Sequence, residues 1–168
     1  MKRVKLINDP AELVALFRAI DSDERRNVMT TLSEGWTMIS DLIEKYGEGA
    51  HGAITYFEKF KLVESRWEVN NDTGRPEKSY RTFYNAFQIS TSLTFDEAQE
   101  LLTVVLLSEK EFDEFESKIV EMIGSDGTFA NDISKGLNIS SLTLKGLVRR
   151  SVKFDFKGHN IVPLKEEE

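Results

Sequence analysis

The fold is decided by residues 37–84, which read TMISDLIEKYGEGAHGAITYFEKFKLVESRWEVNNDTGRPEKSYRTFY. Near the start of this stretch, apolar side chains recur every three or four residues, which places them on one face of a helix. These side chains are Ile39, Leu42, Ile43 and Tyr46. Thr37 is suited to be the N-cap of this helix. Gly47 and Gly49 follow it, and glycine adopts the backbone conformations that a sharp break between two helices requires.

A second helix is expected to begin at Ala50. Its inward positions are spaced by three, four and three residues. They are Ala50, Ala53, Phe57 and Phe60. This spacing leaves five other residues on or near the outer face: His51, Gly52, Thr55, Tyr56 and Lys59. The alternative for Tyr56 is that it packs inward.

Two strands are expected after this helix. Residues 62–69 and 78–83 alternate apolar and polar side chains, and the turn-forming run 70–76 lies between them. This pattern predicts a hairpin with a charged, glycine-bearing tip. Two helices joined by a tight turn and followed by a hairpin form the winged helix-turn-helix pattern.

The hairpin also resembles that of a known family. Residues 74–80, GRPEKSY, are similar to the Gly-Arg-Pro-x-Lys-x-Tyr wing of archaeal winged-helix regulators related to the ArsR group, including the archaeal heat-shock regulators. Residues 62–66 at the entry to the hairpin fit the same pattern, and residues 19–29 match more loosely a helix with an acidic start and paired arginines. The resemblance covers roughly the first half of the chain, and it implies a regulator that binds DNA.

The chain departs from this family pattern in two respects. The family commonly has an Ala-Gly turn between the recognition helix and the first strand, whereas this chain continues through Phe60-Lys61-Leu62. The cysteines of many ArsR-type metal sensors are absent, because the chain contains no cysteine.

Composition narrows the class of protein further. The chain has 168 residues, of which 40% are hydrophobic, enough for one sizeable core or two small ones. Without cysteine there is no disulfide framework, thiolate metal site or cysteine nucleophile, which fits a reducing intracellular setting. No apolar run approaches the ~20 residues that a membrane-spanning helix needs. We therefore expect a soluble, cytoplasmic protein without a membrane partner.

The net charge of −7 argues against nucleic acid at first sight, because DNA binding depends on lysine and arginine displacing counterions from phosphates. The excess is confined to one segment. Residues 1–90 carry 13 basic and 14 acidic side chains, residues 91–123 carry 2 and 9, and residues 124–168 carry 7 and 6. An acidic central segment can face away from DNA. Because the expected recognition helix carries little positive charge, we expect modest and strongly salt-sensitive affinity.

Two helices are expected before the deciding stretch. Asp9-Pro10-Ala11-Glu12 has the residues of a helix start, and the next helix begins at Ser22 and ends at Gly35. Trp36 is expected to form a short strand that pairs with the wing. Arg25 and Arg26 either contact phosphates, as the resemblance implies, or are solvated or paired with Asp23 or Glu24.

Residues 85–92 are expected to be a short connector that leads into two further helices. Thr94 and Ser108 are each followed three residues later by glutamate, the pattern of a reciprocal capping box. The first helix includes residues 101–107, which are apolar nearly all round and so need cover on more than one side. We expect residues 91–123 to form a homodimer contact, against the alternative that they pack only within their own chain.

Residues 124–168 repeat the outline of helix, turn, helix and hairpin, without a residue-level repeat. Six basic residues make the segment from 138 to 165 the most basic part of the chain. They are Lys145, Arg149, Arg150, Lys153, Lys157 and Lys165. This unit is interpreted as a small helical and hairpin unit, a candidate second winged helix that contacts DNA, binds a protein or supports the dimer.

An enzyme is not expected. His51 and His159 are the only histidines, so catalytic pairs and metal clusters have few members to draw on. No glycine-rich phosphate loop is present. We expect no cofactor and no metal site, and the sequence leaves open the sensing of a small molecule or of a metal bound by oxygen ligands, because a pocket beside the apolar helix has no readable signature.

The sequence thus predicts a mainly helical α+β protein with a winged helix-turn-helix at 1–90, a helix pair at 91–123 and a C-terminal unit at 124–168. Its expected function is that of a homodimeric, sequence-specific regulator of transcription that binds double-stranded DNA. The alternative is a winged-helix module that binds a protein within a transcription complex. The expected DNA contacts are His51, Thr55, Tyr56, Lys59, Arg66, Arg75, Lys78 and Arg81.

Overall fold

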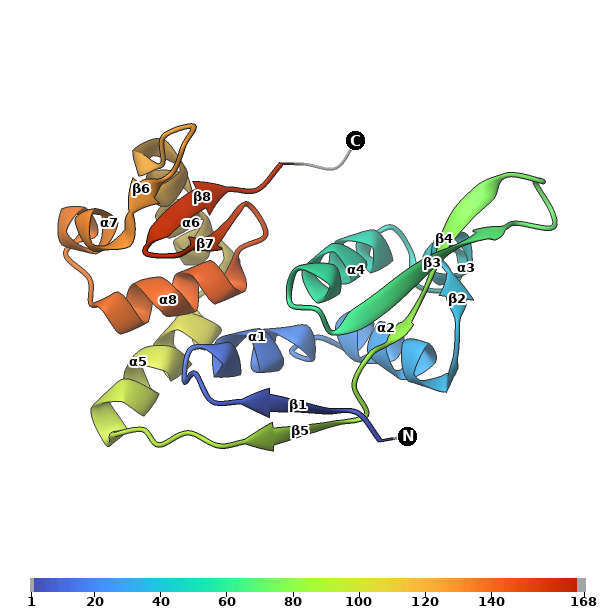
Figure 1. Cartoon of the computed structure of the whole chain (residues 1–168), viewed down its shortest axis with the longest axis horizontal. Coiled ribbons are helices and arrows are strands. Elements are labelled where there is room, and N and C mark those ends of the chain that lie inside the picture. Colours follow the sequence, from blue (N-terminus) through green and yellow to red (C-terminus); the bar gives the residue numbers. More distant parts are fainter. Residues whose placement is uncertain (1, 166–168) are drawn as a thin grey trace. The chain divides into compact units, whose positions relative to one another are not determined.

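The computed structural model describes residues 2–165, and these divide into two compact units (Figure 1). Unit 1 comprises residues 2–7 and 19–90, and unit 2 comprises residues 8–18 and 91–165. The segment 8–18 therefore belongs with the residues that follow position 90, although the sequence placed it with the winged helix. The reason is packing: Ala11 and Val14 are fully buried in the core of unit 2.

Unit 1 contains a winged helix-turn-helix, as the sequence predicted. Its elements are β1 (Val4–Ile7), α2 (Asp23–Glu34), β2 (Thr37–Met38), α3 (Ile39–Tyr46), α4 (Gly49–Lys59), β3 (Val63–Val69), β4 (Pro76–Thr82) and β5 (Ala86–Ile89). Strands β2, β4 and β3 form one antiparallel sheet in that order. Helices α3 and α4 follow one another directly, and the long β3–β4 hairpin extends from the sheet as the wing (Figure 1).

The start of α3 differs from the expectation that Thr37 caps it. Thr37 lies in strand β2, opposite Tyr80 of β4, and the N-cap residue Met38 has no capping side chain. The carboxylate of Glu77 in β4 takes this role, because its Oε1 accepts a hydrogen bond from the backbone N–H of Ser40 at 2.5 Å. The strand that pairs with the wing thus lies one residue after Trp36, and the wing itself caps the first helix of the motif.

Other helix starts agree with the sequence. The Ser22 hydroxyl accepts the backbone N–H of Arg25 at the start of α2. Reciprocal capping boxes are present at Thr94 and at Ser108. These local hydrogen bonds satisfy backbone donors that have no partner within the helix.

Helix α4 ends without the glycine that commonly terminates such a helix. Lys61 has a φ of +53°, in the left-handed region. The N–H of Leu62 donates to the carbonyl of Phe57 and the N–H of Lys61 donates to that of Glu58, which is the Schellman pattern of helix termination. A lysine therefore adopts the conformation for which glycine is usually selected.

Strands β1 and β5 were not predicted, because residues 85–92 were taken as a connector. They pair in parallel, with Val4 opposite Ala86 and Ile7 opposite Ile89. The partners lie about eighty positions apart in the sequence, so no local pattern indicates their pairing.

Unit 2 is built mainly of helices around its own core. Its elements are α1 (Glu12–Ala19, with Ala19 assigned to unit 1), α5 (Phe95–Leu106), α6 (Glu109–Met122), β6 (Thr128–Phe129), α7 (Ala130–Leu137), α8 (Ser141–Arg150), β7 (Phe154–Lys157) and β8 (Asn160–Pro163). The most deeply buried side chains of this core include Val14, Ile119, Ile133, Leu147 and Phe154.

Unit 2 repeats the topology of the winged helix in unit 1. The order β6-α7-α8-β7-β8 matches β2-α3-α4-β3-β4, and the sheet order β6-β8-β7 matches β2-β4-β3. The two strand–helix starts, Thr37 and Thr128, are 91 residues apart, and this offset holds through α3 and α7 to the start of β3 and β7. Gly47 and Asn138, which end the first helix of each motif with positive φ, also obey it.

Candidate nucleic-acid interface

Helix α4 has one buried side and one exposed side. Ala50, Ala53 and Phe57 are at most 3% exposed, whereas His51 and Thr55 are exposed to solvent. The backbone of Gly52 is exposed between them. The face that a helix needs in order to enter a DNA groove is therefore open within the described structure.

The expectation that Tyr56 lies on this outer face is wrong. Tyr56 is only 1% exposed, and its ring lies 4.6 Å from that of Phe60, centroid to centroid. The guanidinium of Arg25 in α2 lies 4.4 Å from the centre of the Tyr56 ring. Positions 53, 56, 57 and 60 share one side of a helix, so Tyr56 belongs to the core and not to the open face of α4.

The remaining predicted residues of α4 lie toward its open side. The Thr55 hydroxyl donates to the carbonyl oxygen of His51 at 3.1 Å, and the Lys59 ammonium lies 4.9 Å from the centre of the Phe60 ring. Glu58 lies beside Lys59 and contacts the Lys78 ammonium of β4 at 3.9 Å. This contact brings the end of α4 and the wing together.

The tip of the wing is an ordered turn built on Asn70. Its side-chain oxygen accepts the backbone N–H groups of Asp72 and Thr73 at 2.9 and 3.3 Å, and its side-chain amide donates to Glu77 at 2.9 Å. Gly74 has a φ of +69°, a conformation that glycine adopts without a steric penalty. The turn therefore holds the next residue, Arg75, in a defined position.

Arg75 is the exposed cation at this tip. Its backbone N–H donates to Thr73 at 3.3 Å and its carbonyl oxygen accepts from the N–H of Asn70 at 2.9 Å. Within residues 2–165, its guanidinium makes no hydrogen bond or ion pair. An anion can therefore bind this guanidinium without first displacing a carboxylate.

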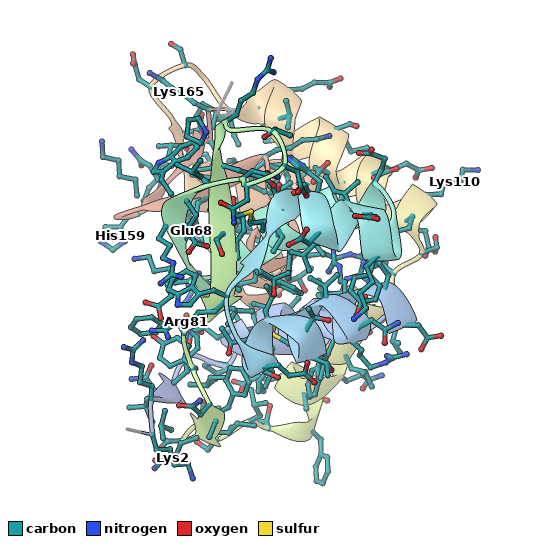
Figure 2. The ribbon with its side chains drawn as sticks, turned by 90° about the vertical axis from the view of Figure 1, so that its right-hand side faces the viewer. Lys2, Glu68, Arg81, Lys110, His159 and Lys165 are labelled. Atoms are coloured by element: carbon teal, nitrogen blue, oxygen red, sulfur yellow. The ribbon has the colours of Figure 1, made fainter. Side chains whose placement is uncertain are left out.

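The other wing cations lie on two different faces of the hairpin. The pairing register places Lys78 opposite Trp67, on the same face as Tyr80, whereas Arg81 opposite Glu64 lies on the other face. Figure 2 shows Glu68 and Arg81 together on that second face. The hairpin thus brings Lys78 near α4 and keeps Arg66 and Arg81 away from it.

Arg66 and Arg81 are held in an ion-pair cluster around Trp36. Their guanidiniums lie 4.1 and 4.7 Å from the centre of the Trp36 ring. Arg66 pairs with Glu68 at 2.6 Å and Arg81 pairs with Glu64 at 2.6 Å. Either arginine must leave a carboxylate before it can bind a phosphate.

The charges of this cluster also act on Glu64. Burial raises the pKa of Glu64, but hydrogen bonds and charge from Arg81 and Arg3 outweigh burial, so the pKa lies below its ordinary value. The Arg3 guanidinium pairs with Glu64 at 3.1 Å and lies over the Phe83 ring. Glu64 is therefore ionised near neutral pH and holds both arginines.

The paired arginines of α2 bind within unit 1. Arg26 pairs with Asp23 at 2.5 Å and donates to the carbonyl of Ile20, and Arg25 lies 4.0 Å from the carboxylate of Asp21. Both arginines therefore lie beside carboxylates of unit 1, and the phosphate contact that the resemblance implies stays a prediction.

Sequence reasoning missed the residues that orient the wing. Glu77 joins β4 to the start of α3, and Asn70 joins the tip to Glu77. Burial raises the pKa of Glu77, but the hydrogen bonds from Asn70 and Ser40 lower it by more than burial raises it, so the pKa lies below its ordinary value. The run Asn70-Asn71-Asp72 is a recognisable signal for an Asx turn, whereas the contact of Glu77 with α3 has no sequence signal.

The match to a protein family agrees with this geometry. A profile of the family described as ArsR transcriptional regulator matches residues 7–165. The chain belongs to the ArsR family. The match of this ArsR-family chain spans residues of both units. A comparison with curated proteins finds no match.

Two other features are absent from the described part of this ArsR-family chain: a metal cluster and a membrane-spanning helix. In residues 2–165, no group of three or more histidine, aspartate or glutamate side chains is arranged to hold a metal ion. None of the helices in these residues has the length and apolar character that crossing a membrane requires.

Proposed function

We propose that this ArsR-family regulator binds double-stranded DNA sequence-specifically, with α4 in the major groove and the wing on the flanking backbone. The observation that carries this proposal is that unit 1 has both an open face of α4, at His51 and Thr55, and an exposed Arg75 guanidinium that makes no hydrogen bond or ion pair with the described residues. A helix in the major groove reads base edges, and cations beside it hold phosphates.

The structure supports different roles for the expected contacts. His51, Thr55 and Lys59 are proposed to reach base edges or phosphates from α4. Arg75 is proposed to bind phosphate or enter the minor groove, and Lys78 to support it. Arg66 and Arg81 are proposed to contribute less, because Glu68 and Glu64 already neutralise them.

The proposal is tested by a salt series of DNA-binding measurements on a preferred site selected from genomic fragments. Log affinity should fall linearly with log salt, and removing one cation that binds a phosphate should reduce the slope by about 0.9. Arg75→Ala should reduce it by about this amount. Lys110→Ala, an exposed lysine of α6, is the matched control and should leave the slope unchanged.

Base reading is tested separately from phosphate binding. Replacing Thr55 with valine or His51 with alanine should reduce the preference for the selected site over random DNA by about 1–3 kcal/mol for each base-specific interaction that is removed. The slope with salt should change little in the Thr55 variant. If both variants keep full preference for the selected site, α4 is not the reading element.

We further propose that the regulator acts as a homodimer through the helices of residues 91–123, because two-fold pairing presents two reading helices to two half-sites. In support, α5 exposes Phe95, Leu102 and Leu106 with exposed fractions of 96%, 54% and 71%. These positions lie along one side of the helix. Leu102→Glu with Leu106→Glu should lower the mass seen in sedimentation equilibrium to that of the monomer, and an unchanged mass would exclude this surface.

We propose a role in the cytoplasm and without catalysis, since binding DNA accounts for the site. If the chain binds no genomic DNA but does bind a protein of the transcription complex, the alternative function as a protein-interaction module is favoured instead.

A further inference from the structure

The second winged helix does not present its reading helix in the way that the first one does. The offset of 91 residues pairs Thr55 of α4 with Gly146 of α8, and Lys59 with Arg150. Gly146 lies against α5 of the same unit: a Cβ built on it would be 3.3 Å from both methyl groups of Val104. The face of α8 that corresponds to the open face of α4 is therefore covered by α5.

Arg150 makes specific hydrogen bonds between α8 and the helix that covers it, α5. Its side chain is 1% exposed, and its guanidinium donates to the carbonyl oxygens of Val104 at 2.9 Å and Leu107 at 2.7 Å. These carbonyls belong to the last turn of α5 and its C-cap. The Arg150 guanidinium is thus hydrogen-bonded to the end of α5, and a DNA duplex cannot reach it while α5 stays in place.

A pocket of about 480 Å³ lies between α5, α6 and α8, beside this covered face. Its volume is within the range of about 300–1,000 Å³ that is typical of small-molecule sites. Four apolar side chains form much of its wall: Val104, Leu107, Phe115 and Leu147. This wall favours an apolar ligand body.

The polar part of the wall is acidic. Asp96 and Glu100 line the pocket, and no lysine or arginine is among the described residues that line it. The Oε2 of Glu100 accepts hydrogen bonds from the hydroxyls of Ser140 and Thr143, the latter at 3.0 Å. Within residues 2–165, the other oxygen, Oε1, has no hydrogen-bond partner. Glu100 is therefore held in place with one oxygen available to a ligand.

We propose that this pocket binds a hydrophobic organic cation, such as an aryl-substituted quaternary ammonium ion. The ligand's apolar body would contact Leu107 and Leu147, and its charge would lie near Glu100 and Asp96. Phe115 adds an aromatic face, which attracts cations. A carboxylate beside an apolar wall disfavours anions, and the described residues hold no cluster suited to a metal ion.

Isothermal titration of the full chain with benzyltrimethylammonium and with tetraphenylphosphonium tests the site. The expected result is saturable binding of at least one cation. Neopentylbenzene replaces the nitrogen of the first probe by carbon at the same shape, so it should bind at least about fivefold more weakly. Glu100→Gln should weaken cation binding by about five- to tenfold, because the ligand loses its ion pair with the carboxylate, which corresponds to about 1–1.4 kcal/mol.

Controls separate recognition by the pocket from general charge effects. Glu100→Gln keeps the side-chain length and a carbonyl oxygen that can accept from Ser140 and Thr143, and Asp96→Asn provides a second variant at an exposed position. Glu114→Gln removes one charge from the exposed face of α6, outside the pocket, and should leave affinity unchanged.

Three outcomes would overturn the proposal: no saturable binding of either cation, equal affinity for the neutral isostere, or equal weakening by Glu114→Gln and Glu100→Gln. The titration contains no DNA, so its result does not depend on the proposed recognition of DNA.

Discussion

Arg150 provides the sharpest test of how unit 2 is held together. Its buried guanidinium donates to the carbonyls of Val104 and Leu107, lies 4.5 Å from the centre of the Phe112 ring, and pairs with Glu109 at 3.1 Å. The perturbation is Arg150→Met, which keeps much of the aliphatic stem and removes the donors.

The expected loss of stability follows from these contacts. Two carbonyl oxygens at the end of α5 lose their donor, at about 1–3 kcal/mol each when they remain away from water. The pair with Glu109 adds little, because the side chain of Glu109 is 74% exposed. Removing a buried charge returns part of its desolvation cost. We therefore expect a net destabilisation of about 2–4 kcal/mol.

The two units can be followed separately in a urea titration. Both tryptophans, Trp36 and Trp67, lie in unit 1, so tryptophan fluorescence reports on unit 1, whereas far-UV circular dichroism includes the helices of unit 2. In Arg150→Met, the circular dichroism transition should move to lower urea by more than the fluorescence transition. Lys145→Met, at an exposed position of α8, is the control.

The reasoning about Arg150 fails if its variant unfolds within about 0.5 kcal/mol of the control, a difference typical of surface substitutions. It also fails if only the fluorescence transition moves, because the hydrogen bonds from Arg150 to Val104 and Leu107 lie within unit 2.

Three further predictions concern unit 1. Glu77→Gln should lower the free energy of unfolding by about 1 kcal/mol, because it weakens the cap of α3. The pKa of Glu77 is lowered in the folded chain. The stabilisation by the Glu77 carboxylate is therefore present above the ordinary glutamate pKa of about 4.3 and is lost as pH falls through the folded pKa. Urea titrations at about pH 7 and about pH 3 should therefore show the difference from wild type shrinking at the lower pH, and a difference independent of pH would contradict the assigned role. Lys61→Gly should stabilise the chain by about 0.5–1 kcal/mol in the same assay, because glycine relieves the left-handed strain at φ +53° despite its greater freedom when unfolded; a loss of stability would refute this explanation. Asn70→Ala should free the wing tip, seen as faster amide hydrogen exchange at Asp72 and Thr73, and unchanged exchange would show that the Asn70 side chain does not order the turn.

Much of the fold and part of the interface could be predicted because the signals are local. The spacing of Ala50, Ala53 and Phe57 marks the buried side of α4, and all three residues are buried. The predicted outward position of Tyr56 was wrong. Position 56 lies three residues after Ala53 and four before Phe60, which is the buried side of the helix, and there the Tyr56 ring contacts Phe60 and the Arg25 guanidinium. Residues 74–80 of the wing indicated the family that the profile match shows. Glu77, within the same residues, accepts a hydrogen bond from the start of α3, and the spacing of residues does not reveal this contact.

The sequence by itself determined the starts of α2, α5 and α6, the tight turns, the wing and the repeat of helix, turn, helix and hairpin. Each of these features depends on residues within a few positions of one another, so a short stretch of sequence contains both the side chains and the backbone that they constrain. Tertiary structure alone decided that residues 8–18 join unit 2, that β1 pairs with β5, and that α5 covers α8. These features depend on which apolar surfaces meet after the chain has folded, and residues tens of positions apart carry no local mark of that choice.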